Sequence, residues 1–364
     1  MASGFTLSIY PWVYTAHHEG DGKWTEGFTE KPHKSAKEEA AMDAPARNEL
    51  LAGRNSFPEL PLVNYTSQYG LGCFEGLKAL PQPDGSLKIF RPEENAARMA
   101  RSMKGLMMPE YPAELFVKAV TEVVRRNQKI GFAPLYDKAW EKDGFQSGHA
   151  VYIRPFSYSE PAIGLGLSHY PWVVMVSTPV GSYFDPDISA KAVTSTMSRA
   201  TPGGTGWIKC DANYVIPILA KKRAEKDGFM EAIFLDSREH RYVEEGSSCN
   251  IFFLLKNGKL VTPSLEDRVL PGVTRKSTIV LAQDLGIVAE ERPIPIDEVM
   301  SDATECFVTG TAAGVAHIES ITHNGKESVF NGRKIGEVTR KLQWQLKGIQ
   351  YGAVPDTHGW MSPV

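Results

Sequence analysis

Cysteine is scarce in this chain, with four residues among 364, and no two of them form a Cys-x-x-Cys pair. A secreted scaffold held by disulfides would be denser in cysteine, and a structural zinc site would need ligands at closer spacing. We therefore expect reduced thiols in a cytoplasmic protein, and no bound metal.

Long apolar runs and clustered charge are also missing from the sequence. No apolar run approaches the roughly 20 residues that a membrane-spanning helix needs. Residues 1–14 contain neither lysine nor arginine, so neither a secretory signal nor a transit peptide is expected. The formal net charge is −3, which argues against the basic surface of a nucleic-acid-binding protein. Small molecules, rather than membranes or nucleic acids, are the expected partners.

The length suits two domains better than a single core. Glycine, proline and aspartate gather around Phe184–Asp187, so we predict a smaller N-terminal α/β domain over 1–178, a linker over 179–190 and a larger C-terminal domain over 191–364. Strands and helices mix without strict βαβ alternation, which favours an α/β class of α+β-like character over a doubly wound parallel sheet.

The polar stretch 15–58 predicts an extended arm with at most one short helix, in which His17 and His18 face solvent. Beyond it, apolar spacing and turn residues predict regular elements. We expect helices over 92–106, 113–129 and 213–226, another from Thr274 and a last one over 332–349. Strands are expected over 76–80, 87–91, 151–158, 172–177, 232–235, 251–255, 260–263 and 306–309.

A glycine-rich turn, Gly203–Gly206, stands just before Lys209, and Asn213 and Tyr214 follow it. Most lysines lie on a protein surface. Lys209, however, follows Trp207 and Ile208, and an apolar setting would lower its pKa and free the amine as a nucleophile. A lysine beside glycines, a tyrosine five residues later and a separate acid are what a pyridoxal phosphate (PLP) enzyme requires.

Glu245 is the candidate acid, because it precedes the small residues 246–248 and an apolar strand that begins at Asn250. A solvent-facing acid at a strand edge is the alternative. A carboxylate among apolar residues is costly unless it meets a cation, and a pyridinium nitrogen is such a cation.

Two turns of small residues are candidate anion sites. Leu270–Arg275 opens a helix, whose first N–H groups and threonine hydroxyl suit a phosphate, although an ordinary helix cap has the same pattern. Gly310–Gly314, after a strand, also offers N–H donors. Arg98, within a predicted helix, is a third candidate for the phosphate, with a solvated helix face as its alternative.

Tyr152 and Arg154 are two positions apart on a predicted strand and therefore project from one face. An arginine among apolar strand residues needs a carboxylate or phosphate partner. Tyr69 and Phe74 could supply aromatic walls to a pocket, although core packing is the commoner role of such side chains.

Together these motifs resemble the branched-chain aminotransferases among the class IV (fold type IV) PLP enzymes, over about residues 69–311. Each motif is weak alone, and seven of them stand in the family's order. The motifs are Tyr69–Ala79; Phe90–Pro92 with Asn95, Arg98 and Met99; Tyr152–Pro155; Gly203–Gly206 with Lys209 and Asn213–Tyr214; Glu245–Gly246 with Asn250–Phe252; Leu270–Arg275; and Gly310–Ala312.

The resemblance implies a larger domain built on a pseudobarrel of mixed strands, PLP as the cofactor and a homodimer. It implies amino transfer between leucine, isoleucine or valine and 2-oxoglutarate, with Lys209 as the Schiff-base lysine and proton carrier. Tyr214 would contact the PLP 3′-oxygen and Glu245 the pyridine nitrogen. The other residues implied to hold PLP are Arg98, Arg199, Leu270, Val273, Thr274 and Thr311.

The resemblance also implies a substrate site. Four residues would bind substrate carboxylates: Tyr69, Arg154, and Thr311 and Ala312 through their N–H groups. Three aromatic residues would line its apolar pocket: Phe74, Tyr152 and Tyr183.

The chain departs from the family's pattern in three places. Asp211 and Ala212 stand where many members have two glycines, the Cys-x-x-Cys pair of some animal members is missing, and the stretch before Tyr69 matches poorly. The alternatives are another class IV enzyme (a D-amino acid or R-amine aminotransferase, or an aminodeoxychorismate lyase) and a non-catalytic protein of this fold. The Tyr152–Arg154 pair favours the branched-chain interpretation, and intact Lys209 and Glu245 favour an enzyme.

Overall fold

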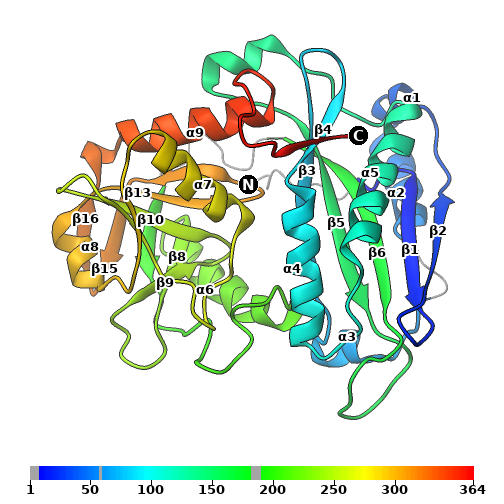
Figure 1. Cartoon of the computed structure of the whole chain (residues 1–364), viewed down its shortest axis with the longest axis horizontal. Coiled ribbons are helices and arrows are strands. Elements are labelled where there is room, and N and C mark those ends of the chain that lie inside the picture. Colours follow the sequence, from blue (N-terminus) through cyan, green and yellow to red (C-terminus); the bar gives the residue numbers. More distant parts are fainter. Residues whose placement is uncertain (1–7, 57–59, 182–189) are drawn as a thin grey trace. The chain divides into compact units, whose positions relative to one another are not determined.

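The computed structural model describes residues 8–56, 60–181 and 190–364 (Figure 1). The chain forms two compact units. Unit 1 comprises Met1–Tyr183, Lys209–Ala212 and Ile349–Val364, and unit 2 comprises Phe184–Ile208 and Asn213–Gly348. The predicted linker 179–190 lies mostly outside the described residues. Unit 1 is the longer unit even without its C-terminal segment, whereas the sequence predicts a smaller N-terminal domain.

Unit 1 is built on a seven-stranded sheet in the order β17-β4-β3-β5-β6-β1-β2. All its neighbouring strands are antiparallel, and Met361 of the last strand pairs with Phe90 of β4. The strands are β1 (Trp12–His18), β2 (Trp24–Glu30), β3 (Leu77–Pro81), β4 (Leu87–Phe90), β5 (Ala150–Tyr158), β6 (Trp172–Val180) and β17 (Met361–Pro363).

The prediction of an extended N-terminal arm is wrong. β1 pairs with both β2 and β6, and its Val13, Tyr14 and Ala16 are fully buried. His18 is buried too, and its Nδ1 lies 2.8 Å from the carbonyl oxygen of His169. The polar residues that suggested an arm lie on β2, the last strand of the sheet, where one edge meets no other strand.

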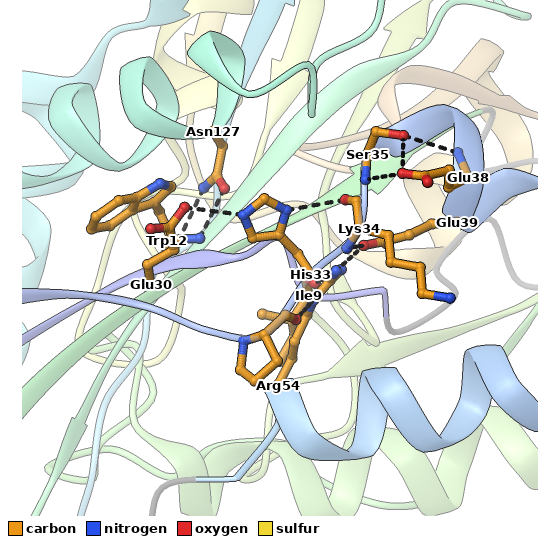
Figure 2. Close-up of polar contacts among 11 residues, drawn as sticks. Ile9, Trp12, Glu30, His33, Lys34, Ser35, Glu38, Glu39, Arg54 and Asn127 are labelled. Carbon is orange, nitrogen blue, oxygen red and sulfur yellow. Dashed lines mark hydrogen bonds and ion pairs between the residues drawn. The ribbon is translucent and has the colours of Figure 1, made fainter.

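Two helices complete this region, α1 (Ala36–Ala40) and α2 (Ala44–Arg54). Figure 2 shows the side chain of Arg54 among groups from several segments. Its guanidinium donates to the carbonyl oxygens of Pro32 (3.0 Å) and Ile9 (3.2 Å) and forms a buried ion pair with Glu39. A buried arginine needs such partners, and they tie the helices to the chain before β1 and after β2.

Helix α5 (Ala113–Lys129) has the predicted bounds, and it packs on β1, β5 and β6 through one apolar face. Phe116, Val120, Val123 and Val124 are buried on that face. The hairpin of β3 and β4 is also confirmed, with Ala79 opposite Ile89. The other helices of unit 1 are α3 (Tyr65–Tyr69), α4 (Pro92–Gly105), which packs on α5, and the 3₁₀ helix η1 (Lys138–Asp143).

Unit 2 contains two five-stranded sheets, in the orders β12-β11-β10-β13-β14 and β16-β15-β7-β8-β9. Both mix parallel and antiparallel pairs, and one apolar core that includes Ile233, Ile251 and Val308 joins them. The strands are β7 (Lys191–Thr194), β8 (Glu231–Leu235), β9 (Val243–Gly246), β10 (Asn250–Leu255), β11 (Leu260–Thr262), β12 (Ala289–Glu291), β13 (Ala303–Gly310), β14 (Gly314–Ile318), β15 (Ser320–His323) and β16 (Lys326–Val329).

The helices of unit 2 are α6 (Val215–Lys226), α7 (Val273–Asp284), α8 (Ile296–Asp302) and α9 (Glu337–Gln350), with 3₁₀ helices η2 (Asp211–Tyr214), where the chain enters the unit, and η3 (Asn331–Arg333). The last helix begins five residues later than predicted, because Gly332 and Arg333 have φ of +59° and +66°, which no α-helix contains. No helix among the described residues is long and apolar enough to cross a membrane.

Candidate active site

Backbone hydrogen bonds within unit 1 fix the position of Lys209. The N–H of Phe74 donates to the carbonyl of Lys209 (3.1 Å), and the N–H of Asp211 donates to that of Gly72 (2.9 Å). The N–H of Lys209 itself donates to the hydroxyl of Ser102 on α4 (3.0 Å). Residues 209–211 therefore run alongside 72–74, just before β3.

The side chain of Lys209 meets an aromatic ring and several charges. Its Nζ lies 4.6 Å from the centroid of the Phe74 ring. Burial of the amine and the charge of Arg98 lower the pKa of Lys209 to about 8, and the charge of Glu75 opposes the change. The sequence predicts such a lowered pKa, and the structure gives its causes.

Glu75 and Arg98 form a buried ion pair with two hydrogen bonds, of 2.7 and 2.8 Å, from the guanidinium Nε and Nη2. Asn95 donates to the same carboxylate at 2.7 Å, and Arg98 holds the pKa of Glu75 below its usual range against the cost of burial. Sequence reasoning assigned Arg98 to a phosphate and overlooked Glu75, although an acid within the apolar run 73–80 was a visible signal.

Arg154 extends along the Phe74 ring with its Cζ 4.7 Å from the centroid, and its Nη2 donates to the hydroxyl of Tyr152 at 3.0 Å. Its buried Nε has no hydrogen-bond partner among the described residues, and none of their acids forms an ion pair with it. A Cβ at Gly76 would collide with the Tyr152 hydroxyl, so any other residue at this position would displace the Tyr152 side chain. We call Phe74, Glu75, Arg98, Tyr152, Arg154 and Lys209 the lysine cluster.

Asp211 lies beside this cluster. Burial raises its pKa to about 6, against the charges of Arg154 and Lys209. Its Oδ2 occupies the space that a Cβ at Gly72 would need. The side chain of Asp211 therefore fits beside Gly72, where a residue with a Cβ would collide with it.

A second group of predicted residues meets within unit 2. The carboxylate of Glu245 lies 2.7 Å from Nη1 of Arg199 and accepts the N–H of Leu270 at 3.2 Å. Arg199 also donates to the carbonyl of Arg268 at 2.9 Å. Glu244, the neighbour of Glu245, is buried and faces the guanidinium of Arg268 at 3.3 Å. We call these five residues the acid cluster; sequence reasoning missed Glu244 and Arg268.

Turns after the acid cluster contain further predicted residues. The amide of Asn250 donates to the carbonyl of Leu270 (2.9 Å), and only glycine fits at 272, since a Cβ there would collide with that amide. Gly272 caps α7 without a side-chain hydrogen bond, and Val273 and Thr274 are buried in its first turn. Thr311 and Ala312 lie in the turn between β13 and β14.

Of the three remaining predicted residues, two lie on described elements. Tyr214 ends the 3₁₀ helix η2, directly before α6. Tyr69 ends α3 with 45% of its side chain exposed. Tyr183 lies outside the described residues.

Comparison with known proteins identifies the family. The sequence model described as Amino-transferase class IV matches residues 72–321, which include both clusters. The chain belongs to the class IV aminotransferases. Enzymes of this family depend on PLP.

Proteins similar to this chain, in sequence or in structure, are named branched-chain aminotransferases. The branched-chain-amino-acid aminotransferase of Mycolicibacterium smegmatis is 37% identical over 305 residues, 81% of this chain and 80% of the relative. The branched-chain aminotransferase of Thermoproteus uzoniensis, solved with norvaline, has a TM-score of 0.71 and 30% identity, covering 84% of this chain and 94% of that one. The PLP form of the Thermobaculum terrenum enzyme has a TM-score of 0.71 and 25% identity, covering 98% and 99%.

Proposed function

We propose that this class IV aminotransferase transfers amino groups reversibly between leucine, isoleucine or valine and 2-oxoglutarate, with PLP as its cofactor. The observation that carries the proposal is the Phe74 ring, which lies within 5 Å of both Lys209 and Arg154. An amine of low pKa, an apolar wall and a cation that lacks an acid partner suit substrates with either an aliphatic side chain or a second carboxylate.

The described residues fit PLP in three respects. Lys209 offers an amine whose pKa burial lowers to about 8. Glu245 offers a buried carboxylate that lies against Arg199 and accepts the N–H of Leu270. The first turn of α7 has no side-chain cap, which leaves a helix N-terminus suited to a phosphate.

The other residues that would contact PLP are assigned from the resemblance to the branched-chain aminotransferases. Lys209 bonds the cofactor, Tyr214 holds the ring oxygen and Leu270 packs on the ring. The phosphate is assigned to Arg98, Val273, Thr274 and Thr311.

PLP, when bound, supplies the electron sink that lets a substrate lose its Cα proton. Because its pKa is about 8, Lys209 is partly neutral at physiological pH, and its Nζ can take that proton. Glu245 would be the acid that faces the ring nitrogen of PLP, and Arg199, 2.7 Å from its carboxylate, would hold it in place. Glu75 balances Arg98, so that Lys209 does not face an unpaired cation.

Substrate groups are assigned as follows. Tyr69 and the N–H groups of Thr311 and Ala312 bind the α-carboxylate. Phe74 and Tyr152, with Tyr183, line the aliphatic pocket. Arg154 binds the second carboxylate of glutamate or 2-oxoglutarate, and the hydroxyl of Tyr152 occupies one of its donors when no carboxylate is present.

Substitution of Arg154 tests the proposal. A charge-assisted hydrogen bond from a partly buried site contributes about 1.5–3 kcal/mol, or roughly 10- to 150-fold in a rate constant. Arg154→Gln should lower kcat/KM for 2-oxoglutarate by that range and for leucine by less, each measured in its own half-reaction. The matched control is Arg126→Gln, which also removes an arginine from two aromatic rings, those of Trp12 and Phe28, and should change neither value.

Two results would contradict the assignment. Equal losses for both substrates would mean that Arg154 binds the shared α-carboxylate. A wild-type enzyme that ignores leucine, isoleucine and valine but accepts D-alanine or an aromatic amine would be another class IV enzyme.

We also propose a homodimer. Two adjacent segments of unit 1 expose apolar side chains: Leu62 is 90% exposed, Ile163 82% and Leu165 95%. The segments touch, because the N–H of Ala162 donates to the carbonyl of Val63 at 3.1 Å. An apolar patch of this kind is typical of a surface that another protein covers.

A further inference from the structure

Two acids stand next to each other on β9, and both are buried, Glu244 with 4% and Glu245 with 3% of its surface exposed. Successive side chains of a strand point to opposite faces. Glu245 meets Arg199 and the N–H of Leu270, whereas Glu244 meets the guanidinium of Arg268. The function proposed above uses Glu245 and leaves Glu244 without a role.

Arg268 connects the two acids. Its guanidinium Nη1 lies 3.3 Å from the carboxylate of Glu244, and its carbonyl accepts Nη1 of Arg199 at 2.9 Å. That same nitrogen of Arg199 lies 2.7 Å from Glu245. Leu270, two residues after Arg268, donates its N–H to Glu245. A movement of the Arg268 side chain that displaces its backbone would therefore disturb both contacts of Glu245.

The contact between Glu244 and Arg268 is easily lost. Neither carboxylate oxygen of Glu244 accepts a hydrogen bond among the described residues. Arg268 has other acids within reach, since it pairs with Glu266 and lies 3.8 Å from Asp267, both of them nearly half exposed. If Glu244 loses its charge, only these outer acids attract the guanidinium.

Glu244 lines a cavity of about 300 Å³ together with Tyr242, Arg268 and Val269, so that protons can reach a residue that is otherwise buried. Burial raises the pKa of Glu244 to about 7, and Arg268 opposes this change. Its charge therefore changes near neutral pH. Other charged groups face it or line the same cavity: Glu245, Arg199, Asp236, Arg238, Glu239 and Glu266.

We propose that Glu244 is a positioning residue, which acts through Arg268 to hold Arg199 and the N–H of Leu270 on Glu245. In the charged form it keeps residues 268–270 against Glu245. In the neutral form it releases Arg268 toward Glu266 and Asp267, and Glu245 loses the N–H of Leu270. The effect on catalysis rests on the proposed function, in which Glu245 serves the cofactor, but the structural coupling does not.

Hydrogen exchange in the protein without PLP tests the coupling directly. Glu244→Gln keeps the shape and removes the charge. At pH 8 a peptide containing Val269 and Leu270 should exchange on the order of 10-fold faster in this variant than in the wild type, since one charge-assisted contact is lost. The two proteins should converge at pH 6, where Glu244 of the wild type is protonated. Glu244→Asp should restore part of the protection.

The matched control is Glu266→Gln, which removes the exposed acid partner of the same arginine and should leave the peptide at the wild-type rate. If Glu244→Gln folds poorly, the pH dependence of exchange in the wild type alone tests the coupling. Protection of the 269–270 peptide, relative to a peptide of β10, should then fall between pH 8 and pH 6. Equal exchange in the wild type and Glu244→Gln at pH 8, or no pH dependence in the wild type, would overturn the proposal.

A second measurement separates this proposal from the proposed function. The dissociation constant for PLP, from titration of the protein without cofactor, should rise on the order of 10-fold in Glu244→Gln at pH 8 and much less at pH 6. If the wild type does not bind PLP, the proposed function is wrong, and the exchange result still decides the coupling. If PLP binds both proteins equally while exchange differs, Glu244 positions this segment without serving the cofactor, and that part of the proposal is wrong.

Discussion

Removing the charge of Glu75 should destabilise unit 1 and also change the chemistry of Lys209. Glu75→Gln leaves Arg98 buried without its ion-pair partner, although Asn95 can still donate to the new side chain. Breaking a buried pair from one side costs about 3–5 kcal/mol. For a unit of this size, each kcal/mol lowers the melting temperature by about 2–4 °C, so we expect a decrease of about 6–20 °C.

The same substitution should lower the pKa of Lys209 below its value of about 8. The carboxylate of Glu75 favours the ammonium form, so without it burial and the charge of Arg98 meet less opposition. Lys209 would then lose its proton at a lower pH, and its amine would react faster at neutral pH. Acetylation of Lys209 by acetic anhydride in the protein without cofactor, followed by mass spectrometry from pH 6 to 10, measures this shift.

Two controls separate these effects from a general loss of structure. Glu122 also pairs with two arginines, Arg125 and Arg126, but on the surface of α5, where Glu122→Gln should cost under about 1 kcal/mol. Glu75→Gln combined with Arg98→Met removes both charges and should recover part of the lost stability. If Glu75→Gln melts at the temperature of Glu122→Gln, the buried pair does not stabilise unit 1. If the acetylation profile of Lys209 does not move, Glu75 does not set its pKa.

Two further predictions concern packing. Gly76→Ala should lower kcat/KM for 2-oxoglutarate by at least about 10-fold, because its Cβ displaces the Tyr152 side chain that orients Arg154, whereas Gly53→Ala, in open space on α2, should have no effect; an unchanged kcat/KM in Gly76→Ala would contradict this geometry. Leu62→Ser with Leu165→Ser should convert the dimer to monomers in sedimentation analysis, whereas Leu135→Ser, at a leucine that is 80% exposed elsewhere, should not; a monomeric wild type would refute the homodimer.

Regular elements with local signals could be predicted from the sequence. The bounds of α5 follow from its apolar spacing, and the hairpin of β3 and β4 follows from the Pro83–Gly85 turn. The pairing of β1 with β6 has no such signal, because Thr15 and Val174 are far apart in the sequence. The C-terminal strand β17 was missed for the same reason, since only its pairing with β4 makes it a strand.

The candidate site likewise has features with a local sequence signal and features that depend on residues distant in the sequence. Lys209 and Glu245 were chosen as candidates from their neighbours in the sequence, because small and apolar residues beside a charged one are a local pattern. What sets the pKa of Lys209 is not local: Arg98 and Glu75 come from α4 and from the segment before β3. Asp211 was noticed only as a departure from the family, and its complementarity with Gly72 required coordinates.

Glu244 shows why the second member of an acidic pair is hard to assign from sequence. In the run Val243–Gly246 both acids look alike, and only one matches a family motif. A strand sends neighbouring side chains to opposite faces, so the two acids must have different partners. Each partner is an arginine distant in sequence, Arg199 for Glu245 and Arg268 for Glu244, and the two arginines are themselves joined by a hydrogen bond. The difference between the acids therefore depends on the fold, while the connection between them makes both relevant to the site.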